Sequence, residues 1–103
     1  MQVDFAPSEQ STVGIEWELA IVDLATGELT PAAPTVLQAC GGGEDAPIRK
    51  EYLQDMVEIV SGVHRTVAAA VEDVAHHLRE VQRVAAPLGL GVVGAGTHPF
   101  SRA

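Results

Sequence analysis

The feature that most constrains the fold is a ten-residue stretch, residues 13–22, in which large apolar side chains recur at every second position: Val-Gly-Ile-Glu-Trp-Glu-Leu-Ala-Ile-Val. Successive side chains of a β-strand point to opposite faces of the sheet, so this period of two predicts a strand, which we place over about residues 12–23. Its apolar face holds Val13, Ile15, Trp17, Leu19 and Ile21. We expect that face to be buried.

The opposite face of this strand carries two acidic side chains, Glu16 and Glu18. Side chains two residues apart on one face lie roughly 7 Å from each other, so the two carboxylates repel. In a partly desolvated setting they would be protonated, paired with Arg or Lys, or bound to a divalent cation. The alternative is that this face of the sheet meets water and the glutamates are simply solvated.

A second acidic strand is predicted over Met56–Ser61, which is rich in β-branched residues. Glu58 would share a face with Met56 and Val60, leaving the neighbouring apolar residues on the other face. Glu51 lies seven residues before Glu58. Mg²⁺ takes oxygen ligands and is commonly held by a few carboxylates together with substrate phosphates. The pattern therefore offers Glu16, Glu18, Glu58 and Glu51 as metal ligands, with solvated carboxylates as the alternative.

The remaining elements are predicted from turn residues and helical spacing. We expect a turn and a short returning strand up to residue 30, a short helix over 31–39, a glycine-rich loop over 41–45, a long helix over 66–87 and a strand over 90–96. The apolar stripe of the long helix holds Val67, Val71, Val74, Leu78, Val81 and Val84. Residues 97–100 are expected to form a loop, and residues 1–11 a flexible arm before a domain at 12–103.

Histidines are the other candidate ligands. His76 and His77 are consecutive, so on a helix they point about 100° apart, and we interpret them as surface residues. His98 lies in the expected Gly-Thr-His-Pro-Phe loop after a strand, where binding groups are often presented, although a capping or turn role fits equally. Ser61 and His64 do not make a hydrolase site, because neither an acid partner nor a nucleophile elbow is evident.

Composition narrows the function classes. With 14 acidic and 6 basic residues the net charge is -8, which disfavours binding to nucleic acid or to an anionic membrane surface. Cys40, the single cysteine, excludes an internal disulfide and a cysteine-based zinc site, and we expect it to be inert. The N-terminus does not have the pattern of a signal peptide and no apolar run reaches membrane-spanning length, so a cytoplasmic protein is expected.

Three motifs together resemble a known family. They are Val-Gly-Ile-Glu-Trp-Glu-Leu-Ala-Ile-Val-Asp over residues 13–23, Lys-Glu-Tyr-Leu-Gln-Asp-Met-Val-Glu-Ile-Val-Ser-Gly-Val-His over 50–64, and Gly-Ala-Gly-Thr-His-Pro-Phe over 94–100. In order and spacing they are similar to the N-terminal portion of the carboxylate–amine ligases of the glutamate–cysteine ligase type 2 family. The Glu-Trp-Glu core resembles the actinobacterial type. The resemblance spans about residues 11–102.

The resemblance implies an α+β, glutamine-synthetase-like fold, in which helices pack behind an antiparallel sheet. It also implies an ATP-dependent reaction, in which a glutamate-like acid is activated as an acyl phosphate and a cysteine-like amine displaces phosphate to give γ-glutamylcysteine. By motif, Glu16 and Glu18 resemble ligands of Mg²⁺ at the nucleotide phosphates. Glu58 and Glu51 resemble further carboxylates of that site, and Thr97 and His98 part of the substrate pocket. No covalent nucleophile is implied.

The chain departs from the family in length, since the family's members are several times longer. Arg49, Lys50 and Arg65 are too few to hold the phosphates of ATP and of the acyl phosphate. We therefore interpret the chain as an incomplete catalytic domain that is not competent alone. The alternative is a non-catalytic interaction or structural module, in which an exposed sheet edge pairs with another chain or with a second copy.

Overall fold

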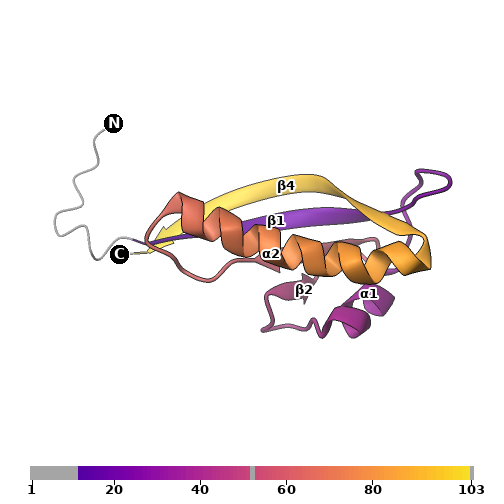
Figure 1. Ribbon diagram of the computed structural model, residues 1–103, viewed down its shortest axis with the longest axis horizontal. Coiled ribbons are helices and arrows are strands. Elements are labelled where there is room, and N and C mark those ends of the chain that lie inside the picture. The colour runs from indigo at the N-terminus through magenta and orange to yellow at the C-terminus, as the bar shows by residue number, and fades with distance from the viewer. Residues whose placement is uncertain (1–11, 52, 103) are drawn as a thin grey trace.

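The computed structural model describes residues 12–51 and 53–102 and is an α+β structure, as expected (Figure 1). Its elements in chain order are β1 (Thr12–Asp23), α1 (Ala33–Cys40), β2 (Ile48–Lys50), β3 (Met56–Val60), α2 (Val67–Ala85), the 3₁₀ turn η2 (Ala86–Leu88) and β4 (Leu90–Arg102). The expected arm at residues 1–11 lies outside the described residues. None of the described helices has both the length and the apolar character needed to cross a bilayer.

The four strands form one antiparallel sheet in the order β2-β3-β1-β4, with β1 in the interior. The predicted alternation of β1 is confirmed. Leu19 and Ile21 are fully buried, Ile15 is buried, and Val13 and Trp17 pack at the margin of the core. Apolar residues of α1 and α2 close this core from one side of the sheet. The other side of the sheet carries the glutamates and no described helix.

β3 is confirmed with the predicted faces. Val57 and Ile59 are fully buried on the helix-covered side, where they pair with β1 residues of that same face. Full burial of an aliphatic side chain of this size contributes about 1.5–3 kcal/mol. The short strand β2 was not predicted, because three residues are too few to show a period, yet Ile48 is buried as the β2 partner of Ile59.

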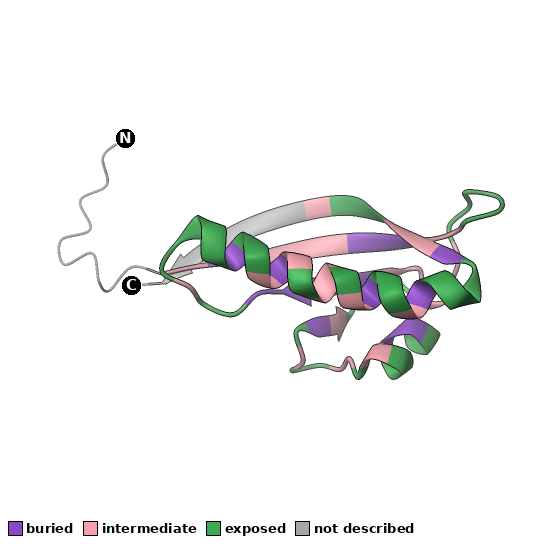
Figure 2. Ribbon diagram, in the orientation of Figure 1, coloured by how far each residue is buried: buried purple, intermediate pink, exposed green. Residues whose placement is uncertain are grey.

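The long helix α2 is confirmed, and most of its predicted apolar stripe with it: Val74 and Val81 are buried, and Leu78 and Val84 pack against the core. Its N-cap is Thr66, whose hydroxyl accepts a hydrogen bond from Ala69 N at 3.1 Å. The residues buried beneath the helix are Ala70, Val74, Val81 and Ala85, whereas Val67 and Val71 are 63% and 50% exposed (Figure 2). Ala70 and Ala85, which the prediction did not include, complete the buried face of the helix.

Two further predictions, the short strand up to residue 30 and the loop at 97–100, differ from the structure. The expected strand after the first turn is a single bridge between Val22 and Leu29, and the turn before it is closed by a bond from Gly27 N to Asp23 O, with Gly27 at φ 75°. The loop expected at 97–100 is instead part of β4, which pairs with the whole length of β1. Pro99 has no backbone N–H to donate, but β4 is an edge strand. Proline is tolerated at an edge, because an N–H that points away from the sheet has no neighbouring strand to bond.

The connection from β3 to α2 is fixed to β1 by hydrogen bonds. Val13 and His64 exchange backbone bonds of 2.7 and 2.8 Å. The buried hydroxyl of Ser61 accepts from Ile15 N at 2.8 Å and donates to Gly62 O at 2.7 Å. Ser61 therefore extends the ladder beyond the end of β3.

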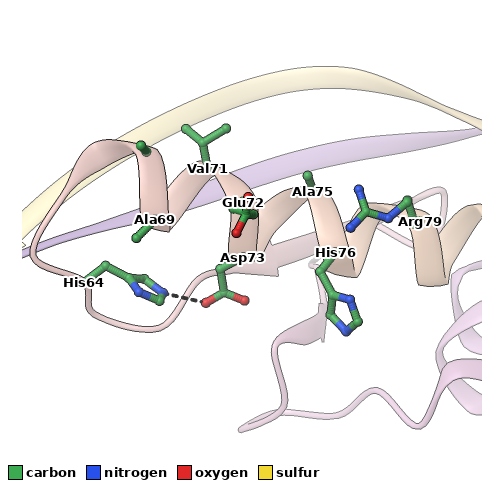
Figure 3. A pocket seen from close by; sticks show the side chains of 9 residues that line it. His64, Ala69, Val71, Glu72, Asp73, Ala75, His76 and Arg79 are labelled. Carbon is green, nitrogen blue, oxygen red and sulfur yellow. Dashed lines mark hydrogen bonds and ion pairs between the residues drawn. The ribbon is translucent and has the colours of Figure 1, made fainter.

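Asp73 of α2 ties the same connection to the helix. Its Oδ2 lies 2.8 Å from His64 Nε2, the contact dashed in Figure 3, and accepts from Gly62 N at 2.8 Å, while its Oδ1 lies 3.0 Å from His77 Nε2. His76 is exposed as predicted, but His77 is only 19% exposed and serves this contact. Burial raises the pKa of Asp73, but the bonds from His64 and Gly62 outweigh it, so the pKa lies below the usual 3.8.

We predict that Asp73→Asn destabilises the chain by about 1–3 kcal/mol at pH 7, because an amide cannot replace a carboxylate that is hydrogen-bonded to Gly62 and His64 and lies beside His77. A lowered pKa stabilises the folded state above the unfolded-state value, and this stabilisation is lost as pH falls. The difference between wild type and variant in urea unfolding should therefore shrink as pH falls below about 3.8. Glu72→Gln, an exposed neighbour on α2, is the control. Equal stability of both variants at pH 7 would contradict the prediction.

Candidate functional site

The sheet face that the helices leave open carries a row of polar positions across all four strands. Glu18 of β1 is paired with Glu58 of β3 on one side and with Gly96 of β4 on the other. Glu58 is in turn paired with Arg49 of β2. Neighbouring strands lie about 4.8 Å apart, so Arg49, Glu58 and Glu18 stand at successive places in one line across the sheet. Each of these three side chains is partly exposed.

Glu16 lies on the same face of β1, two residues before Glu18. Its partners in the ladder are Val60 of β3 and His98 of β4. Thr97 is instead paired with Trp17, which belongs to the helix-covered face. The register thus brings Glu16, Glu18, Glu58 and the backbone position of His98 together, and it separates Thr97 from them.

The carboxylates interact electrostatically. The pKa of Glu58 is raised, first by partial burial and then by the negative charges of Glu16 and Glu51, to which Glu18 adds a smaller effect. Arg49 acts in the opposite direction and lowers this pKa. The other three acidic residues singled out in the sequence therefore all raise the pKa of Glu58, and the opposing effect of Arg49 does not cancel theirs.

The oxygen donors here suit Mg²⁺ in chemistry, although the described side chains do not form a ready cage. Among the described residues, no group of three Asp, Glu, His or Cys side chains converges closely enough to hold an ion. Mg²⁺ is usually bound through one or two carboxylates, with waters and phosphate oxygens completing the octahedron. The facing pair Glu18 and Glu58, with Glu16 beside it, fits that pattern of binding.

Two members of the row were not singled out from the sequence. Arg49 belongs to the short strand β2, and its Nε donates to Ala46 O at 2.7 Å, which anchors the guanidinium beside Glu58. Gly96 provides room for Glu18, since a Cβ at this position would lie 3.2 Å from Glu18 Oε1. Gly96 lies in the expected strand over 90–96, whereas the place of Arg49 beside Glu58 follows only from the register.

The hollow on the outer side of α2, drawn in Figure 3, is a separate feature. It is lined by His64, Glu72, Asp73, His76 and Arg79 together with small apolar residues. It lies on the helix layer, across the sheet from the glutamates, and both oxygens of Asp73 already serve the contacts of the β3–α2 connection. We therefore assign the candidate site to the open face of the sheet.

We predict that Glu58→Gln stabilises the chain at pH 7 in buffer free of divalent cations. Like charges facing each other across antiparallel strands destabilise by about 0.2–1 kcal/mol, and the substitution removes that repulsion. An acid with a raised pKa stabilises the fold while protonated, and this contribution is lost as pH rises through the raised pKa. The advantage of the variant should thus vanish in thermal unfolding below about pH 4.5, the ordinary Glu value.

Glu28→Gln, in the exposed turn after β1, is the control for this measurement and should change stability little. A Glu58→Gln variant less stable than wild type at pH 7 would show that the attraction of Arg49 for Glu58 exceeds the repulsion from the other carboxylates.

Comparison with known proteins gives one consistent result. The chain is 48% identical over 104 residues to a protein of Leifsonia xyli subsp. xyli named "Putative glutamate--cysteine ligase 2". It is 45% identical over 109 residues to a Paenarthrobacter aurescens protein named "Putative glutamate--cysteine ligase 2-2". Each alignment covers 98% of this chain but 28% of the relative, so the chain spans less than a third of the length of these curated relatives.

The family comparison covers the described fold and the candidate site together. The sequence profile of glutamate–cysteine ligase family 2 matches residues 12–103, which include β1, β3 and β4 with all the acidic positions discussed above. The match covers far more than half of the chain, and it agrees with the resemblance carried by the three motifs. The chain belongs to glutamate–cysteine ligase family 2.

Proposed function

We propose that this chain provides the metal- and nucleotide-binding floor of an ATP-dependent carboxylate–amine ligase. The observation that carries the proposal is the row on the open sheet face, where Glu18 and Glu58 face each other across two strands within the region that matches the family. Several carboxylates on one face of a sheet favour cations there, and Mg²⁺ is the usual companion of ATP.

In this proposal Glu16, Glu18 and Glu58 hold Mg²⁺, and Glu51 contributes charge from the end of β2. When bound, the metal neutralises the charge of the phosphates as a phosphoryl group is transferred. The chain's own contribution is orientation, because carboxylates on paired strands are held by the ladder and not by a mobile loop. Arg49 adds a positive charge at the margin of the row, suited to an anionic group of the substrate.

The substrates we propose are a glutamate-like acid, a cysteine-like amine and ATP. The acid would be activated as an acyl phosphate and the amine would displace phosphate, giving γ-glutamylcysteine, in the cytoplasm where ATP is plentiful. His98, paired with Glu16 in the ladder, is the better candidate for a substrate contact. Thr97 remains a weaker one, because its ladder partner is on the helix-covered face.

A second function rests on a different observation. β4 is a 13-residue edge strand, and the described sheet ends at it. An edge of that length is a template for strand addition, so a non-catalytic interaction module, or self-association through β4, is the competing proposal.

The ligase proposal is tested in a full-length setting, because the chain spans only part of its relatives. Residues 12–103 replace the matched region of the Leifsonia xyli protein, and release of phosphate from ATP is measured with glutamate and cysteine. Glu18→Gln should lower kcat by about 100-fold or more, the scale for removing one group that stabilises transition-state charge. Glu28→Gln should leave kcat unchanged.

Two results would decide against the proposal. Normal turnover of the Glu18→Gln chimera would exclude the metal assignment. A folded wild-type chimera with no glutamate- and cysteine-dependent turnover would favour the interaction module, which sedimentation of the 103-residue chain then tests directly through its oligomeric state.

A further inference from the structure

An apolar groove lies on the helix side of the sheet, away from the glutamates. It is lined from below by Ile15 and Trp17 of β1 and from the side by Val71, Val74, Ala75 and Leu78 of α2. Val71 is 50% exposed and Val67, one turn earlier, is 63% exposed. Exposed branched side chains around a tryptophan form a continuous apolar surface, which folded domains usually cover.

The lining residues of α2 have the spacing of a helix-packing ridge. Positions 71, 74, 75 and 78 follow the pattern i, i+3, i+4, i+7, which marks one face of a helix. Figure 3 shows Val71 and Ala75 on the side of α2 toward β4, while His76 lies on the opposite side. The small Ala75 allows a neighbouring helix axis to approach within the 8–10 Å typical of packed helices.

The helix layer covers only part of the sheet. α1 packs with α2 and with strands β2 and β3, so it lies on the side away from β4. Figure 1 shows α2 along β1 with β4 uncovered beside it. The indole of Trp17 lies against Gly94 of β4, since a Cβ there would lie 3.1 Å from Trp17 Nε1. The groove itself lies between β1 and α2, and its lining is almost entirely apolar.

We propose that a helix with an apolar face, from the polypeptide that full-length members of this family have outside the matched region, packs into this groove beside α2 and over β4. The relatives carry more than two thirds of their length outside that region, so such a segment is available in those proteins. A second copy of this chain is a poorer occupant, because two copies of net charge -8 repel. The proposal does not depend on ligase activity.

Trp17 provides a specific probe, because it is the single tryptophan of the chain and lines the groove. The chain is labelled with 5-fluorotryptophan and mixed with the unlabelled Leifsonia xyli protein from which the matched region has been removed. Binding should shift the ¹⁹F resonance of Trp17 and reduce its solvent-isotope shift by about half or more, as the ring loses contact with water.

Val71→Asp should weaken this binding by about tenfold or more, because the carboxylate would be desolvated in an apolar contact. Leu53→Asp is the matched control: Leu53 is 54% exposed but lies between β2 and β3, at the other end of the sheet, so binding should not change. Both positions are about half exposed, so both variants should fold, which circular dichroism checks.

Three outcomes would overturn the inference. Binding that leaves the ¹⁹F resonance of Trp17 unchanged would place the contact elsewhere. A shift of that resonance with the concentration of the labelled chain alone would assign the groove to a second copy. If the labelled chain and the shortened Leifsonia xyli protein do not associate, thermal unfolding of the full-length chimera is measured instead. Equal melting temperatures of its Val71→Asp and Leu53→Asp forms would then count against a covered groove.

Discussion

The structure depends on one central strand that is paired along both of its edges. β1 exchanges hydrogen bonds with β3 on one side and with β4 on the other, and its alternation separates an apolar face from an acidic one. A shift of this register by one residue would exchange the two faces, burying Glu16 and Glu18 and exposing Leu19 and Ile21. The burial of the apolar face therefore fixes where the carboxylates stand, and the position of the site follows from the energetics of the core.

The acidic row is unfavourable for the isolated fold, and its arrangement limits that cost. Glu58 faces Glu18 on one neighbouring strand and Arg49 on the other, so one attraction opposes several repulsions. A purely structural sheet would gain by replacing Glu58 with a neutral residue. Groups that destabilise a fold and converge on an open face are typical of functional sites, where a ligand supplies the missing charge.

Local patterns predicted much of this fold, and interactions between distant residues account for what they missed. The period of two in β1 and the β-branched run in β3 specify each strand and its faces without reference to neighbours. β2 forms on the longer strand β3, and the C-terminal half of β4 forms because β1 offers backbone partners along its whole length. Pro99 suggested a loop there, but β4 is an edge strand, where proline is tolerated. The contact of Asp73 with His64 likewise arises only when helix and loop meet, whereas its contact with His77 is a local i, i+4 pair within α2. At the candidate site the glutamates were recognised from alternation, but Arg49 required the register.

The two open surfaces of the chain are linked through three consecutive residues of β1. Glu16 and Glu18 lie on the acidic face, while Trp17 between them borders the apolar groove on the other. A segment that packs on Trp17 would restrict the backbone of β1 where it presents both carboxylates. Since metal ligation is sensitive to displacements well below 1 Å, covering the groove would order the site on the opposite face without contacting it. The open side of the helix layer and the acidic face would then both be completed by polypeptide that the longer relatives carry outside the matched region.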